Sequence, residues 1–165
     1  STVHLGGYNA TLLGLADSVD QYNSSHADDA IVYVETFGDF SVMQLTADEM
    51  GQMIGNVVSH EFGHLLGLFH TQVPADVMDT TGSAWDLAEN QSFIRGELEE
   101  SVFPTGYEDS PIRLAEILGY SANLKQASRA MLLSDDAAQR RAELRRLVHV
   151  EMHYGCGTCL ELDGE

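Results

Sequence analysis

The sequence predicts a small α+β domain, and three stretches carry this prediction. Residues 30–37 form a β-branched and aromatic run, which is typical of a strand. Residues 46–64 begin with helix-start signals and repeat their apolar side chains at helical spacing. Residues 110–119 begin with Ser-Pro and end with Gly, the usual signals at the two ends of a helix. A strand between longer helices indicates a mixed fold with a reduced sheet.

The composition limits the class of protein. A chain of 165 residues with 44% hydrophobic content is long enough for one domain with a core. Eight Lys and Arg against 26 Asp and Glu give a net charge of −18, so nucleic acid and anionic membranes are poor partners. A salty habitat, calcium binding and solubility all explain the acid excess, and the sequence does not separate them. No apolar run approaches the roughly 18 residues of a membrane span.

The N-terminal part predicts a strand, a helix and a second strand. Residues 2–5 alternate weakly and predict a short strand. Apolar residues recur at helical spacing over 12–22, so we expect an amphipathic helix there. The strand at 30–37 follows a polar loop, and residues 40–44 are either a further short strand or an irregular edge. The chain begins at Ser1 without Met or signal peptide, so we expect a processed or excised piece.

The next helix has a strongly marked start. Thr46 and Glu49 have the spacing of a capping box, and Leu45 and Met50 that of a hydrophobic staple. Charged residues are sparse further along, and apolar side chains form two neighbouring stripes. We therefore expect a helix that is buried nearly all round.

This helix carries the motif His60-Glu61-x-x-His64-x-x-Gly67-x-x-His70. His60 and His64 share one helix face, so their imidazoles can bind one metal ion. Gly67 tolerates positive φ and can end the helix in a left-handed turn, which would return His70 to the same ion. Three His at about 2.0–2.1 Å leave a fourth position for water, which is the catalytic arrangement of zinc. Glu61 would take a proton from that water, so the pattern indicates a hydrolase.

Met78 follows this motif in Pro74-Ala75-Asp76-Val77-Met78. Together the two stretches resemble the metzincin zinc peptidases, and the spacing from His70 to Met78 is most similar to the matrixin branch. The resemblance covers mainly residues 46–79, with a looser fit to Gly119. It implies a metzincin-like fold with a Met-turn in which Met78 forms an apolar floor beneath the metal. It further implies that the helix at 110–119 packs below the site.

The resemblance also implies an activity. We expect a zinc endopeptidase with His60, His64 and His70 as metal ligands, Glu61 as general base, and a protein or peptide as substrate. The substrate would lie extended beside an edge strand, for which residues 31–45 are the candidate. The segment after the Met shapes the specificity pocket in this family, so residues 79–82 leave the preference open. We expect an extracellular or otherwise extracytoplasmic location, and the sequence does not indicate an oligomeric state.

A different class remains open: a catalytically idle binding module, derived from a metzincin, that keeps its zinc for structure. Structural zinc sites normally have four protein ligands, so a fourth protein ligand would favour this alternative.

The C-terminal part is predicted to be a separate helical tail, residues 121–165, after a catalytic domain at 1–120. Residues 135–148 predict a helix. His149 and His153 precede Cys156-x-x-Cys159, the spacing of a zinc knuckle, so a second, structural zinc is one interpretation. A Cys156–Cys159 disulfide, free thiols in an acidic tail, and a redox pair are the competing ones.

Overall fold

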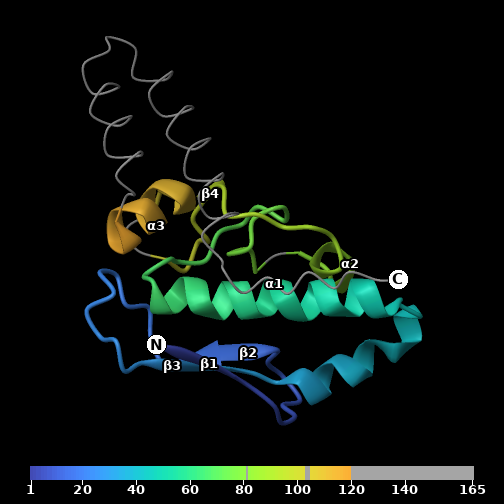
Figure 1. Ribbon diagram of the computed structural model, residues 1–165. Coiled ribbons are helices and arrows are strands. Elements are labelled where there is room, and N and C mark those ends of the chain that lie inside the picture. The colour runs from blue at the N-terminus through green and yellow to red at the C-terminus, as the bar shows by residue number, and fades with distance from the viewer. Residues whose placement is uncertain (81, 103–104, 120–165) are drawn as a thin grey trace, which may run out of the picture. The chain divides into compact units, whose positions relative to one another are not determined.

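The computed structural model describes residues 1–80, 82–102 and 105–119 (Figure 1). The chain divides into two compact units, Ser1–Arg113 and Leu114–Glu165. Most described residues belong to the first unit. The predicted helix at 135–148 and the His/Cys cluster of the tail lie outside the described residues, and the proposed domain boundary at residue 120 stays a prediction.

A small mixed sheet forms one layer of the first unit. Its strand order is β1 (Thr2–Leu5), β3 (Asp29–Val32), β2 (Gly14–Ala16), with β1 parallel and β2 antiparallel to β3. Ala30 is 4% exposed and Val32 is fully buried, because alternate side chains of β3 face α1. The predicted strand at 2–5 is confirmed. The strand predicted at 30–37 is confirmed only at its start.

The helix predicted over residues 12–22 is wrong. These residues contain β2, whose register places Gly14 opposite Val32 and Ala16 opposite Ala30. The apolar repeat does not form one buried face, since Leu15 remains 50% exposed. Glycine is a poor helix former, and pairing with β3 is a non-local gain that helical spacing does not register.

The segment that follows β3 is also not a strand. Residues Val34–Met43 form a 3₁₀ helix, η1, in place of the second half of the predicted strand and the edge expected at 40–44. Thr36 explains part of this change, because its side-chain oxygen both accepts from the Asn9 N–H at 2.9 Å and donates to the Asn9 carbonyl at 3.0 Å. Phe37, 2% exposed, packs into the core with Met53 and Val57 of α1.

The long helix α1 (Ala47–Leu65) lies on the sheet (Figure 1). Its predicted capping box is present: Glu49 N–H donates to Thr46 Oγ1 at 3.2 Å, and Thr46 N–H donates to Glu49 Oε2 at 2.7 Å. Its burial is less complete than expected. The first turn is exposed and Phe62 is 40% exposed, whereas the face that carries Met53, Val57, Glu61 and His64 is buried.

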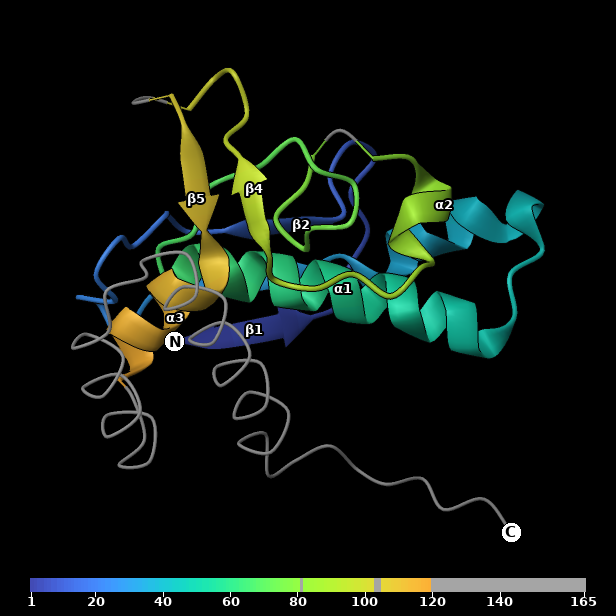
Figure 2. The same cartoon turned by 90° about the horizontal axis from the view of Figure 1, so that it is seen from above.

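The described residues that follow α1 return over its other side in short elements (Figure 1). These are α2 (Ala84–Leu87), β4 (Arg95–Glu97) and β5 (Tyr107–Asp109). Figure 2 shows β4 and β5 side by side, and they pair antiparallel. The predicted helix at 110–119 is confirmed as α3 (Ser110–Leu118), which begins in the first unit and ends in the second. Its expected position below the site stays a prediction.

Candidate metal centre

Three histidines converge at the C-terminal end of α1. His60 and His64 lie on the last turns of the helix, and His70 comes from the loop that follows. The Nε2 atom of His64 is 3.1 Å from Nε2 of His60 and 2.9 Å from Nε2 of His70. Ligands at 2.0–2.1 Å around a tetrahedral ion are separated by about 3.3–3.4 Å. The two distances from His64 are therefore within about half an ångström of the spacing that one metal ion requires, and the three ligand atoms all lie within 4.8 Å of one another.

The turn that returns His70 depends on Gly67. Its φ of +86° is left-handed, as predicted, and its N–H donates to the His64 carbonyl at 2.9 Å. The next N–H, of Leu68, donates to the Gly63 carbonyl at 2.9 Å. These two bonds form a Schellman motif, which satisfies carbonyls at the helix end while reversing the chain. A Cβ on Gly67 would also lie 2.5 Å from Gln21 Cα, so the loop after β2 closes against this turn.

Two backbone carbonyls fix the tautomers of the helix histidines. His60 Nδ1 donates to the Val77 carbonyl at 2.8 Å, and His64 Nδ1 donates to the Leu68 carbonyl at 2.8 Å. In each neutral ring the proton is therefore on Nδ1, and Nε2 carries a lone pair. Two lone pairs that face each other repel unless a cation lies between them. The donor set consequently fits a metal ion, and the Nδ1–H···O=C bonds are the usual outer support of metal-binding imidazoles.

Burial keeps these rings neutral. Loss of solvation lowers the pKa of His60 to about 3 and that of His64 to about 4. Burial also lowers the pKa of His70, and the nearby carboxylates of Glu99 and Asp79 oppose that shift. Neutral imidazole is the form that binds metal, so these lowered pKa values favour metal binding.

Glu61 is buried against the edge strand. It is 6% exposed, and burial raises its pKa to about 7, while a hydrogen bond from the Ala16 backbone partly offsets the shift. Gly14 gives the carboxylate its room, because a Cβ there would lie within 2.7 Å of three Glu61 side-chain atoms. Residue types alone do not indicate this contact, because Gly14 lies inside the helix predicted at residues 12–22.

A turn at residues 76–79 packs against the helix that carries His60 and His64. Met78 is fully buried, and a Cβ on Gly63 would lie 2.5 Å from its sulfur, so the methionine packs directly on α1. Asp76 holds the turn by accepting from Thr71 Oγ1 at 3.0 Å and from the Met78 N–H at 3.2 Å. Burial raises the pKa of Asp76, which is 0% exposed. Sequence reasoning did not single out Asp76, although an aspartate two residues before Met78 in a turn is a recognisable signal.

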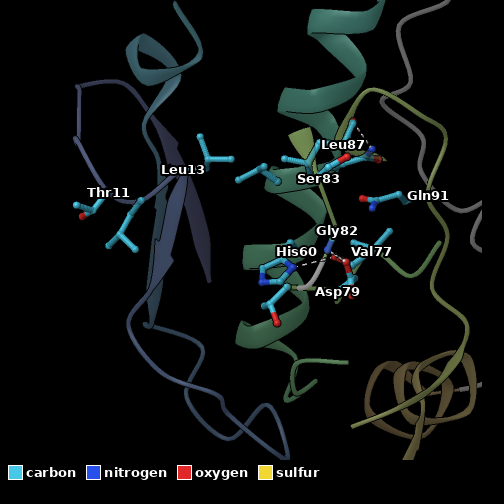
Figure 3. A pocket seen from close by; sticks show the side chains of 13 residues that line it. Thr11, Leu13, His60, Val77, Asp79, Gly82, Ser83, Leu87 and Gln91 are labelled. Atoms are coloured by element: carbon cyan, nitrogen blue, oxygen red, sulfur yellow. Dashed lines mark hydrogen bonds between the residues drawn. The ribbon is translucent and has the colours of Figure 1, made fainter. Parts of the chain in front are cut away.

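A cavity of about 400 Å³ borders the metal centre (Figure 3). His60 lines this cavity and is also one of the three clustered histidines. In the view of Figure 3, Thr11 and Leu13 lie on one side of His60, and Asp79 and Gly82 on the other. The remaining lining residues are Leu12, Asn56, Val57, Val77, Thr80, Ser83, Leu87 and Gln91.

The edge of the sheet differs from the one expected at residues 31–45. β3 is the central strand, and β1 and β2 are the two edge strands, both of which contact α1. The prediction failed because residues 12–22 were assigned to a helix. They contain β2, which pairs with the side of β3 that was expected to be an exposed edge.

Comparison with known proteins agrees with this geometry. The family model described as Matrixin matches residues 16–93 of the 165, a span that includes the three histidines, Glu61 and Met78. No curated protein and no solved structure matches the chain. The match and the convergent histidines together show that residues 16–93 are similar to the matrixin family.

Proposed function

We propose that this protein is a zinc-dependent endopeptidase that hydrolyses peptide bonds of protein or peptide substrates. The observation that carries the proposal is the convergence of the Nε2 atoms of His60, His64 and His70, with two of the rings held by carbonyls in the tautomer that binds metal. The matrixin match supports the same reaction class.

The three imidazoles would hold the metal, and Met78 would form the floor of the site in the manner of a Met-turn. When bound, zinc lowers the pKa of a water to about 7 and polarises a carbonyl. Among the described residues the grouped donors number three rather than the four of a structural zinc site, which supports catalysis over the idle binding module.

Glu61 is the general base in this proposal. Its carboxylate accepts the proton of the attacking water and delivers it to the leaving amine. A pKa of about 7 suits both steps, because the group then gains and loses a proton near neutral pH. Burial against β2 holds the carboxylate in place.

β2 is the proposed docking edge for an extended substrate. It pairs with β3 on one side, and the other side of an edge strand offers main-chain donors and acceptors to a peptide. The cavity beside His60 would then receive the substrate side chain next to the scissile bond.

Two further assignments belong to this proposal. An extracellular or extracytoplasmic location rests on the matrixin likeness; among the described residues, no helix is long and apolar enough to cross a membrane. The second, structural zinc at the tail cysteines stays a prediction, and metal stoichiometry of the chain against one ending at residue 134 tests it.

The test of the function is hydrolysis of a denatured protein by the zinc-loaded chain, with and without chelator. His64→Ala is expected to lose both bound zinc and activity. Glu61→Gln is expected to bind zinc like the parent and to lose at least about 100-fold in kcat. Glu35→Gln, at an exposed position, serves as the matched control. Normal turnover by Glu61→Gln would show that another group is the base.

A further inference from the structure

The hairpin formed by β4 and β5 is bonded to the segment that carries His70 (Figure 2). The Phe69 N–H donates to Glu108 Oε2 at 2.7 Å, and the Glu99 N–H donates to the His70 carbonyl at 3.0 Å. The hairpin follows the residues that match the matrixin family, 16–93, so the match itself assigns the hairpin no role.

The first strand of this hairpin approaches the same segment closely. The Gln72 N–H donates to the Glu97 carbonyl at 2.9 Å. Gly96 is buried, and a Cβ on it would lie 2.9 Å from Thr71 Cβ, so the absence of a side chain permits the contact. The backbone on both sides of His70 is therefore held from the hairpin.

The ring of His70 is held differently from the rings of His60 and His64. Both helix histidines donate through Nδ1 to backbone carbonyls, at 2.8 Å. Nδ1 of His70 lies instead 3.9 Å from Oε2 of Glu99, a carboxylate. This distance is too long for a hydrogen bond, but it is short enough for a direct electrostatic interaction between the charge and the ring.

This arrangement leaves two tautomers open to the neutral His70 ring. With the proton on Nε2, the ring donates to Nε2 of His64, 2.9 Å away, and has no lone pair there for a metal. With the proton on Nδ1, Nε2 carries the lone pair that a metal needs, and the positive end of the Nδ1–H dipole is on the side of Glu99. A negative charge at Glu99 therefore favours the tautomer that binds metal.

The Glu99 carboxylate is itself oriented by its turn. Ser101 Oγ donates to Glu99 Oε2 at 2.6 Å, and the Val102 N–H donates to the Glu99 carbonyl at 2.9 Å. The side chains of Glu99 and His70 are 31% and 37% exposed, so water screens their interaction only in part.

We propose that Glu99 is a positioning residue of the metal centre, whose carboxylate holds His70 in the tautomer that binds metal. It does for His70 what backbone carbonyls do for His60 and His64. The proposal rests on the proposed role of His70 as a metal ligand, and it assigns the support of that ligand to a residue after β4. Loss of such an outer partner typically weakens metal binding by roughly 10- to 100-fold.

The test compares Glu99→Gln with Glu100→Gln, an exposed neighbour that loses the same charge one position along the chain. Competition with a chromophoric chelator at pH 7 gives the zinc dissociation constant of each variant. We expect Glu99→Gln to bind zinc about 10-fold more weakly than the parent, and Glu100→Gln to bind it like the parent. The urea midpoint of metal-free Glu99→Gln should stay parental, because the amide oxygen can still accept from Ser101.

The visible spectrum of the cobalt(II)-loaded protein provides a second readout, which a merely structural role would not change. The bands should shift in Glu99→Gln and not in Glu100→Gln, because the charge beside His70 alters its strength as a donor. Parental zinc affinity or an unshifted spectrum in Glu99→Gln would overturn the proposal and leave the three-histidine site standing. An equal loss in Glu100→Gln, or a lowered metal-free midpoint in Glu99→Gln, would also overturn it. A parent that binds no zinc would overturn the proposed function, and this proposal with it.

Discussion

Gly14 and Glu61 contact each other so closely that no side chain could stand at position 14. A Cβ there would lie within 2.7 Å of the Glu61 Oε1, Cδ and Cγ atoms. The edge strand and the proposed general base are thus fitted to one another.

Gly14→Ala should therefore displace the Glu61 carboxylate while leaving the three histidines in place. We expect kcat to fall about 10- to 100-fold, because a general base loses its effect when it leaves its position. Zinc content should remain that of the parent, as measured by metal analysis. Gly38→Ala is the matched control, because nothing lies within 4 Å of its added Cβ. Equal rates for the two variants would refute the coupling of Gly14 to Glu61.

Gly67→Ala should be strongly destabilising. The added Cβ costs about 1–2 kcal/mol at a left-handed φ of +86°, and it would meet Gln21 backbone atoms in addition. Gly119→Ala separates the two costs, since Gly119 has a φ of +82° with nothing within 4 Å. We expect thermal unfolding to show a larger loss for Gly67→Ala, accompanied by weaker zinc binding because His70 moves. A loss no greater than that of Gly119→Ala would argue against the close approach of Gln21.

Acidification should destabilise the metal-free protein between about pH 6.5 and pH 4. The pKa of His60 is lowered to about 3 and that of His64 to about 4 in the folded state, against 6.5 when unfolded. The unfolded state therefore binds roughly two more protons through these rings in this window, and stability rises with pH. The raised pKa of Glu61, from 4.5 to about 7, acts in the opposite direction, because there the folded state binds the extra proton.

The lowered pKa of His70 adds to this slope, whereas the raised pKa values of Asp76 and Glu108 oppose it as that of Glu61 does. Glu61→Gln removes one opposing group, so its slope should exceed that of the parent by up to about one proton, or about 1.4 kcal/mol per pH unit. Urea unfolding in chelator at pH 4.5–6.5 measures both. A slope that is unchanged by Glu61→Gln would mean that Glu61 titrates at its ordinary pKa in the folded protein.

Asp76→Asn should destabilise the turn at residues 76–79. The carboxylate accepts from Thr71 Oγ1 and the Met78 N–H, and an amide would aim its own N–H groups at buried donors. We expect a loss of about 1–3 kcal/mol in the free energy of unfolding and weaker zinc affinity, since Val77 in the same turn orients His60. Asp48→Asn, at an exposed site, should unfold like the parent. Parental zinc affinity in Asp76→Asn would separate the turn from the metal centre.

The structural features that were predicted correctly from the sequence involve residues that lie close together along the chain. The capping box at Thr46 and Glu49 and the left-handed turn at Gly67 are each encoded within a few residues, and both are present. β2 was missed because its three residues become a strand only through pairing with β3, fourteen or more positions along the chain.

The candidate site divides in the same way. The convergence of His60, His64 and His70 follows from helix spacing and one glycine, and the structure brings these side chains together. The contacts that orient them do not follow from residue types. The Val77 and Leu68 carbonyls are backbone atoms available at any residue, and Gly14 reaches Glu61 from another layer.

The carbonyl bonds of His60 and His64 have a consequence for the energetics of folding. These bonds place the Nε2 lone pairs of His60 and His64 toward each other, with 3.1 Å between the two nitrogen atoms. Folding therefore creates a local electrostatic repulsion at the end of α1. A bound cation would remove this repulsion without moving the rings. The carbonyl bonds already fix the ring orientations in the metal-free protein, so metal binding costs little further entropy. The metal-free protein should therefore be less stable around these histidines than the metal-loaded protein. Amide hydrogen exchange around Leu68 and Val77 should slow more on metal loading than exchange in the sheet.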